Sequence, residues 1–194
     1  MENALSEFID FLDEALSNVG EHYWVVHSAE DEFFLRERVF CYELYHQMRK
    51  IQDPDTAKDN IKMRYPIFSK IDIYAEPDKR GWADLTAEEK KNPDFIFHEK
   101  ESRNNLVVME VKCDINGDFV KDFNTLRSYV GEKGHLKYKC GVFFLYGHSM
   151  SEAVRKIKLL EIPTTDSDKI YVFTQKSKET DLERKSLKEI MEWS

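Results

Sequence analysis

The sequence predicts a single α/β domain in which a mixed β-sheet is flanked by helices, with additional helices at both ends. Its 194 residues are 41% hydrophobic, which suits one ordinary domain with a substantial core. The predicted elements follow the order α-α-β-β-β-α-β-α-β-α. An antiparallel meander precedes βαβ crossovers, and this order requires a sheet with both antiparallel and parallel strands.

We divide this domain into an acidic N-terminal helical segment (1–29), a core (30–175) and a C-terminal helix (176–194). The first half of the fold is expected to hold two helices and three strands. Apolar residues recur with a helical period in the first of these segments, and the last two strands are joined by a polar turn, which is a hairpin signal. The expected ranges are helices at 3–19 and about 30–51, and strands near 67–74, 93–98 and 106–113.

The second half of the sequence alternates helices and strands. Asp118 is suited to cap one helix, and Ser149 with Glu152 forms a capping-box pattern at the start of another. The run at 140–146 is apolar throughout, which is typical of a strand buried on both faces. The expected ranges are a helix at 118–130, a strand at 140–146, a helix from 149, a strand at 169–175 and a charged helix from about 179.

The net charge of −8 arises from the start of the chain. Residues 1–32 contain nine acidic residues and no Lys or Arg, whereas residues 33–194 contain 28 acidic and 29 basic residues. The body of the domain can therefore carry a local basic surface that binds DNA. The acidic N-terminal helix is suited to contact with a protein partner or to self-association.

Other features exclude whole classes of protein. No stretch approaches the roughly 18 apolar residues of a membrane span, and the acidic start differs from the basic start of a secretory signal. The three cysteines, Cys41, Cys113 and Cys140, lie too far apart for a disulfide framework or a zinc knuckle. These features predict a cytoplasmic protein with no membrane contact.

Two charged residues interrupt the apolar strand at 106–113. Alternate residues of a strand share a face, so Glu110 and Lys112 point to one side, while the apolar residues around them form the core face. Unpaired charges inside a sheet are costly unless they are matched or bound to a metal ion. A site is therefore expected here, and the alternative is a buried Glu110–Lys112 pair without a metal.

The preceding strand supplies a second carboxylate. Asp94 begins that strand directly after Pro93, and antiparallel pairing of the hairpin can bring Asp94 beside Glu110. Two carboxylates facing one point are suited to a hard divalent cation such as Mg²⁺ or Mn²⁺. The Lys112 amine would then orient a water molecule or stabilise developing negative charge.

This Pro-Asp, followed on the next strand by Glu-Val-Lys, resembles the motif of the PD-(D/E)xK nucleases. The resemblance covers residues 30 to about 146 and implies a restriction-endonuclease-like fold. It also implies Mg²⁺-dependent hydrolysis of DNA phosphodiester bonds, with Asp94 and Glu110 as metal ligands and Lys112 as the catalytic lysine. The family often adds a further acid from the N-terminal helix.

The helix at 30–51 offers two candidates for that acid. At about 100° per residue, Glu37 falls at the centre of the apolar stripe, an unfavourable place for a charge unless it serves a site. Glu43 is the alternative third carboxylate, or it contacts the substrate together with Gln47 on the polar flank. If Glu37 serves no site, we expect it to pair with a buried Arg or Lys.

Basic residues indicate where a nucleic-acid backbone would bind. Residues 112–158 contain nine basic and five acidic residues, and Lys121 and Arg127 lie on the helix that follows the Glu110 strand. We therefore take Lys121 and Arg127 as candidate substrate contacts. The alternative is that these residues belong to ordinary solvated helix faces.

Two classes of function remain open from the sequence. The first is a metal-dependent nuclease that cuts DNA, and such an enzyme is expected to form a homodimer if it cuts both strands of a duplex. The second is a catalytically inactive nuclease-like module that binds nucleic acid or protein.

Overall fold

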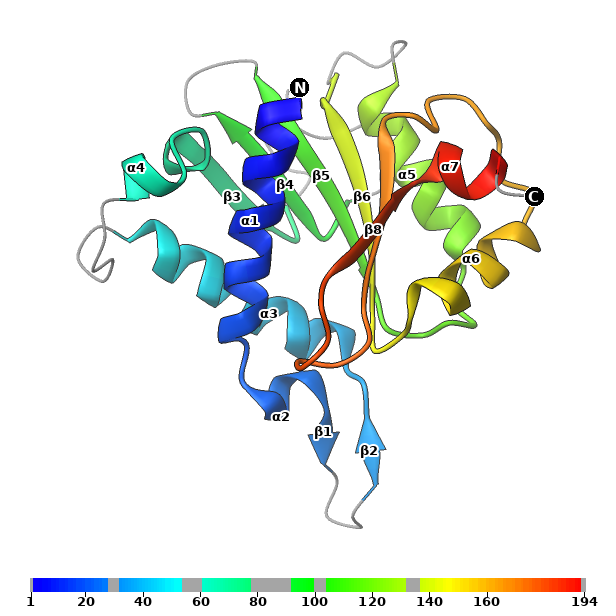
Figure 1. Cartoon of the computed structure of the whole chain (residues 1–194), viewed down its shortest axis with the longest axis horizontal. Coiled ribbons are helices and arrows are strands. Elements are labelled where there is room, and N and C mark those ends of the chain that lie inside the picture. The colour runs from blue at the N-terminus through cyan, green and yellow to red at the C-terminus, as the bar shows by residue number, and fades with distance from the viewer. Residues whose placement is uncertain are drawn as a thin grey trace.

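A six-stranded mixed sheet forms the centre of the computed structural model, which describes residues 2–27, 32–53, 61–77, 92–99, 104–131 and 137–192 (Figure 1). The strand order is β3-β4-β5-β6-β7-β8. Neighbours are parallel from β5 to β7 and antiparallel elsewhere, so the predicted α/β class and mixed sheet are confirmed. The strands are β3 (Ile71–Ala75), β4 (Phe95–Glu99), β5 (Asn105–Lys112), β6 (Cys140–Tyr146), β7 (Ile170–Gln175) and β8 (Glu183–Ser186).

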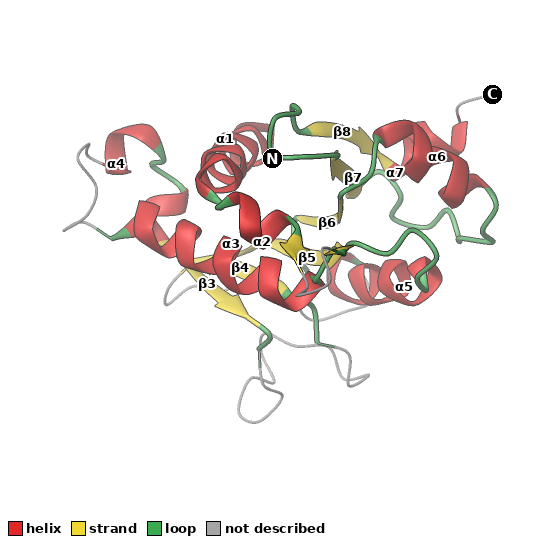
Figure 2. Cartoon of the chain, turned by 90° about the horizontal axis from the view of Figure 1, so that it is seen from below, coloured by secondary structure: helices red, strands yellow, loops and turns green. Residues whose placement is uncertain are grey.

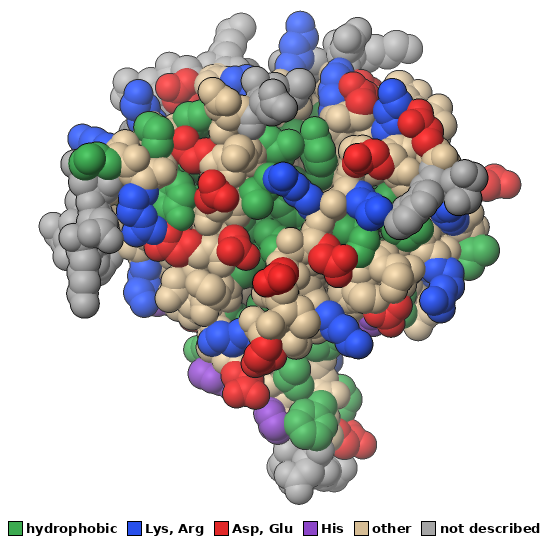
Figure 3. All heavy atoms as spheres, in the orientation of Figure 1, with side chains coloured by type: hydrophobic (Ala, Val, Ile, Leu, Met, Phe, Trp, Pro, Cys, Tyr) green, Lys and Arg blue, Asp and Glu red, His purple; other side chains and the backbone are tan. Residues whose placement is uncertain are grey.

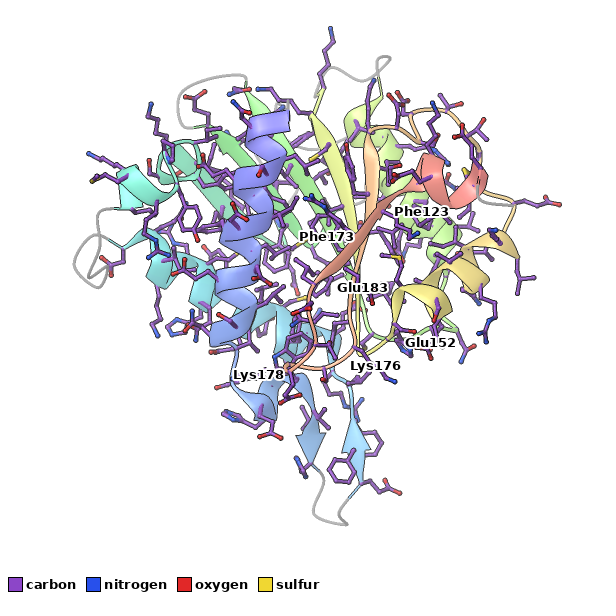
Figure 4. The ribbon with its side chains drawn as sticks, viewed as in Figure 1. Phe123, Glu152, Phe173, Lys176, Lys178 and Glu183 are labelled. Carbon is purple, nitrogen blue, oxygen red and sulfur yellow. The ribbon has the colours of Figure 1, made fainter. Side chains whose placement is uncertain are left out.

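Helices cover both faces of this sheet (Figure 2). The helices are α1 (Glu2–Asn18), α2 (Glu21–Trp24), α3 (Glu37–Gln52), α4 (Ile61–Arg64), α5 (Phe119–Val130), α6 (Met150–Lys158) and α7 (Leu187–Glu192), with a 3₁₀ turn at Phe68–Lys70. One core lies between the sheet and α1 and α3, and the other lies under α5, α6 and α7. Phe173 of β7 belongs to the first core and Phe123 of α5 to the second (Figure 4). Among the described residues, no helix is long and apolar enough to cross a membrane.

The capping signals of the sequence are confirmed. Asp118 caps α5, where its Oδ1 atom accepts a hydrogen bond from the Lys121 backbone nitrogen at 3.1 Å. Ser149 and Glu152 form both bonds of the capping box at the start of α6. Every residue of β6 is buried, as its continuous apolar run predicts.

Two predicted element boundaries are wrong. The helix expected from about residue 30 begins at Glu37, because Phe33–Phe34 (β2) pair with Val26–His27 (β1) in a small hairpin. Aromatic and β-branched residues favour that pairing over a further helical turn. This hairpin also ends the segment that we expected to be helical up to residue 29.

The C-terminal helix expected over 176–194 is also wrong in part. Strand β8 (Glu183–Ser186) pairs antiparallel with β7, and only Leu187–Glu192 is helical among the described residues. An edge strand tolerates charged side chains because one side of it faces solvent. The sequence Glu-Arg-Lys-Ser therefore gives no apolar alternation from which a strand can be predicted.

The acidic side chains of α1 gather on the face of the molecule shown in Figure 3. Two of these acids bind the chain itself. Glu7 accepts hydrogen bonds from the backbone nitrogens of Ile67 and Phe68, each at 2.7 Å, and Glu14 contacts Tyr65 and Arg64. These contacts fix α1 to the segment before β3.

One glycine is required where β6 meets α6. Gly147 has φ of +80°, and a Cβ atom built there would lie 2.4 Å from the Leu35 Cδ1 atom. We expect Gly147→Ala to lower the free energy of unfolding by about 1–3 kcal/mol, because alanine disfavours this backbone conformation and displaces Leu35. Thermal unfolding measures the loss. Gly20→Ala is the control, since Gly20 has φ of −66°, and an equal loss in both variants would contradict the expectation.

Candidate functional site

Asp94 and Glu110 lie side by side where β4 and β5 meet. Phe95 pairs with Met109 across the two strands, and the next position in that register brings Asp94 opposite Glu110. The Val111 backbone nitrogen donates a hydrogen bond to Asp94 Oδ2 at 2.7 Å, which fixes the Asp94 carboxyl. The two carboxyl groups are themselves within hydrogen-bonding reach of each other.

Strand alternation determines where these side chains point. Val107, Met109 and Val111 pack into the core under α1 and α3, so Glu110 and Lys112 face the opposite side of β5. Glu110 is only 6% exposed, whereas the Lys112 side chain is 21% exposed at the end of the strand. The sheet therefore holds a buried acid next to an amine that reaches its surface.

Lys112 lies between two further carboxylates from the covering helices. Its Nζ atom is 3.5 Å from Glu37 Oε2, at the first residue of α3, and 3.5 Å from Asp122 Oδ2, in the first turn of α5. The Glu37 side chain is 35% exposed and the Asp122 side chain 6%. Four carboxyl groups thus surround one ammonium group.

Burial and mutual repulsion make this cluster a poor place for so many negative charges. Burial, with the neighbouring Asp94 and Asp122 charges, raises the pKa of Glu110 to about 10. Burial also raises the pKa of Asp94, Glu37 and Asp122. For Lys112, burial alone would lower the pKa, but the surrounding carboxylates, Asp122 foremost, raise it above the ordinary value.

A pocket of about 440 Å³ adjoins the cluster on the side of α3. Arg38 and Glu76 form an exposed ion pair at 3.3 Å on its wall. Because Asp94 and Glu37 both line the pocket, a ligand in it would contact the cluster. The lining residues are Glu37, Arg38, Cys41, Glu76, Asn92, Pro93 and Asp94.

Glu43 and Gln47 lie outside the cluster. The Gln47 Nε2 atom donates a hydrogen bond to Glu43 Oε1 at 2.5 Å, and Gln47 is buried. Glu43 is six residues along α3 from Glu37, a rise of about 9 Å at about 1.5 Å per residue. Of the two candidate acids, it is therefore Glu37 that reaches the cluster, where it pairs with a lysine as the alternative interpretation expected.

The two basic candidates on α5 have different surroundings. Lys121 is exposed beside Asp122. Arg127 donates from Nε to the Thr165 carbonyl at 3.1 Å and from Nη2 to the Pro163 carbonyl. Arg127 therefore holds the loop before β7 to α5, and this contact is a structural role that the sequence did not indicate.

Asp122 is the cluster residue that our sequence interpretation missed. It lies three residues after Phe119 and directly before Phe123, both of which are buried. An acid next to an apolar helical stripe is an anomaly related to the one that identified Glu37, which falls at the centre of its stripe. The signal was therefore present, but an acid in the first turn of a helix is also explained by the helix dipole.

The cluster fits a divalent cation by its donor chemistry. In the described part of the chain, no three His, Cys, Asp or Glu side chains are grouped closely enough to form a complete metal site. Asp94 and Glu110 nevertheless offer two adjacent carboxylates, and Mg²⁺ is commonly held by one or two carboxylates with water completing its coordination.

In comparisons with known proteins, no family model, no curated protein and no solved structure matches the chain. The functional argument therefore depends on the fold and on the cluster itself. The sheet brings Asp94, Glu110 and Lys112 together, and helices α3 and α5 add Glu37 and Asp122.

Proposed function

We propose that the protein is a divalent-metal-dependent nuclease that hydrolyses DNA phosphodiester bonds. The observation that carries the proposal is the Asp94–Glu110 carboxyl pair inside the sheet, with Lys112 beside it. Such a pair is costly to bury, and a bound cation offsets that cost. We further propose that the chain is a cytoplasmic member of the PD-(D/E)xK nucleases with a restriction-endonuclease-like fold.

In the proposed reaction, each residue of the cluster would have its own role. Asp94 and Glu110 would hold Mg²⁺ or Mn²⁺, and when bound the ion would supply Lewis-acid charge and a more acidic water molecule. Lys112 would stabilise negative charge that develops on the phosphate oxygens. Asp122 is buried and would keep the Lys112 ammonium at the end of β5. Glu37 is more exposed, and it would leave its ion pair with Lys112 and bind the metal ion instead.

One observation favours the second class, a binding module without turnover. Glu37 already has a counter-charge in Lys112, whose Nζ atom lies 3.5 Å away. In a module of this kind, the lysine alone would balance the carboxylates. The same fold would then hold nucleic acid or protein and would need no metal ion.

Cleavage assays separate the two classes. We expect the protein to cut single-stranded, duplex or branched DNA in Mg²⁺ or Mn²⁺ and to lose this activity in EDTA. Asp94→Asn removes one acid of the pair and is expected to reduce cleavage at least about 100-fold. Salt-sensitive binding without cleavage would support the module instead, and cleavage that survives Asp94→Asn would reveal a contaminating nuclease.

A further inference from the structure

The outward face of α3 carries cationic and aromatic side chains and no acidic ones. Arg38, Tyr42, Tyr45, His46 and Arg49 fall on one side of the helix, because about 3.6 residues make one turn. All but Tyr45 are exposed, and Tyr42 is 55% exposed. A basic helix face with an exposed tyrosine ring has the chemistry of a surface that binds anionic strands.

The acidic residues of α3 are turned away from this face. Glu37 pairs with Lys112, and Glu43 accepts a hydrogen bond from Gln47. Arg38 does contact Glu76 at 3.3 Å, but both side chains are largely exposed. An exposed ion pair is weak, so a phosphate group is able to take the place of Glu76.

This face of α3 extends from the candidate site to a second pocket. It starts one residue after Glu37, at the candidate site, and runs toward α4 (Figure 1). Arg38 and Arg49 are separated by a rise of about 16 Å along the helix. At the far end lies a pocket of about 490 Å³, whose lining includes the bases Arg49, Lys50 and Lys70 and the acids Asp53 and Asp72.

We propose that the outer face of α3 binds a nucleic-acid strand with unpaired bases. Arg38 and Arg49 contact phosphates and Tyr42 stacks on a base, because the face of a base is accessible only when the strand is not in a duplex. The proposal rests on the nuclease function, since the face would guide a single strand to the candidate site. It makes single-stranded DNA, or a duplex with an unpaired end, the substrate class.

The charge part of the proposal is tested by removing both arginines. A fluorescein-labelled oligothymidine is titrated with the protein in EDTA, where cleavage is absent, and its anisotropy is measured at several salt concentrations. We expect Arg38→Gln/Arg49→Gln to lower affinity at least tenfold. The slope of log affinity against log salt should also fall by about 1.4, at about 0.7 for each lost phosphate contact.

The stacking part is tested at Tyr42. Tyr42→Ala should lower affinity for the single strand by roughly 5- to 100-fold with the salt slope unchanged, because a ring is lost and no charge. Affinity for the matching blunt duplex should not change. Tyr42→Phe keeps the ring and should bind as the wild type does.

The control is Arg184→Gln on β8, an exposed arginine at the opposite edge of the sheet. Thermal unfolding of every variant excludes a loss of fold. Three results would each overturn the proposal. The wild-type protein does not bind the single strand, the α3 variants bind it no worse than Arg184→Gln does, or Tyr42→Ala weakens binding to the duplex as much as binding to the single strand. Binding through α3 without any cleavage in Mg²⁺ would refute the nuclease alone, whereas cleavage that is unchanged in the α3 variants would refute the α3 surface alone.

Discussion

Replacing Glu110 by Gln is expected to make the protein more stable and to abolish the DNA cleavage that we propose for it. Glu110 is 6% exposed and lies beside Asp94, so its charged form is disfavoured in the folded chain. Glutamine has nearly the same shape and carries no charge. We expect the free energy of unfolding to rise by about 1–3 kcal/mol at pH 8, which is about 2–12 °C in Tm for a chain of this size.

The gain should depend on pH in a definite direction. The pKa of Glu110 is raised from its ordinary value of 4.5 to about 10, so the folded protein holds this proton more tightly than the unfolded chain does. Above pH 4.5 the unfolded chain releases the proton, and wild-type stability falls until about pH 10. The difference in Tm between Glu110→Gln and the wild type should therefore be small near pH 4.5 and should grow up to pH 9.

Although Glu110→Gln should stabilise the fold, it should weaken metal binding and abolish cleavage. Glu110→Gln removes a proposed metal ligand, so Mg²⁺ should raise the Tm of the wild type but not that of the variant. Glu161→Gln is the control, because Glu161 is exposed and the substitution makes the same change of side chain away from the cluster. An equal Tm for Glu110→Gln and wild type at pH 9 would contradict the view that the carboxyl pair destabilises the metal-free fold.

The position of the carboxyl pair was predictable because it depends on local rules. Residues alternate along a strand, and antiparallel pairing can bring Asp94 beside Glu110, so their proximity was expected from the chain alone. The exact register was not, because the pairing shifts between Phe97 and His98. The core face of β5 follows from the same alternation. Glu37 was found by an equally local rule, the helical period, although the partner that it contacts is a lysine of another element.

Other features depend on packing between distant segments. Asp122 joins the cluster because α5 packs on the sheet beside β5, and no pattern within the helix states which strand it covers. Strand β8 forms because β7 offers an edge with unpaired backbone groups, while its own residues are polar. The contact of Arg127 with the loop before β7 likewise joins residues 36 and 38 positions apart.

Lys112→Ala is expected to reduce both cleavage and stability. Among the described residues, the Lys112 ammonium forms the ion pairs of the cluster, and its loss leaves the buried Asp122 without that ion pair. We expect cleavage to fall about 100- to 1,000-fold, because charge on the phosphate is no longer stabilised. Stability at pH 8 should fall by about 2 kcal/mol, less than for a fully buried pair, since Lys112 is partly exposed.

The loss of stability should become smaller toward pH 5. The pKa values of Glu37, Asp94 and Asp122 are raised, so these carboxyl groups are increasingly protonated as the pH falls, and a neutral carboxyl group gains little from a neighbouring ammonium. Tm measured for the wild type and Lys112→Ala between pH 5 and pH 8 checks this trend. A constant difference across that range would mean that the lysine acts through packing and not through charge.

A second substitution then identifies which carboxylate Lys112 mainly neutralises. In the Lys112→Ala background, Asp122→Asn removes the buried charge left behind and should restore about half of the lost stability or more, with a coupling energy of about 0.5–3 kcal/mol in the double-mutant cycle. Asp114→Asn in the same background is the matched control, because Asp114 is exposed two residues from Lys112 and should restore nothing. Cleavage should stay lost in both double variants, since neither restores a cation. Recovery of cleavage by Asp122→Asn would show instead that Lys112 serves only to balance Asp122, and that it has no direct part in the reaction.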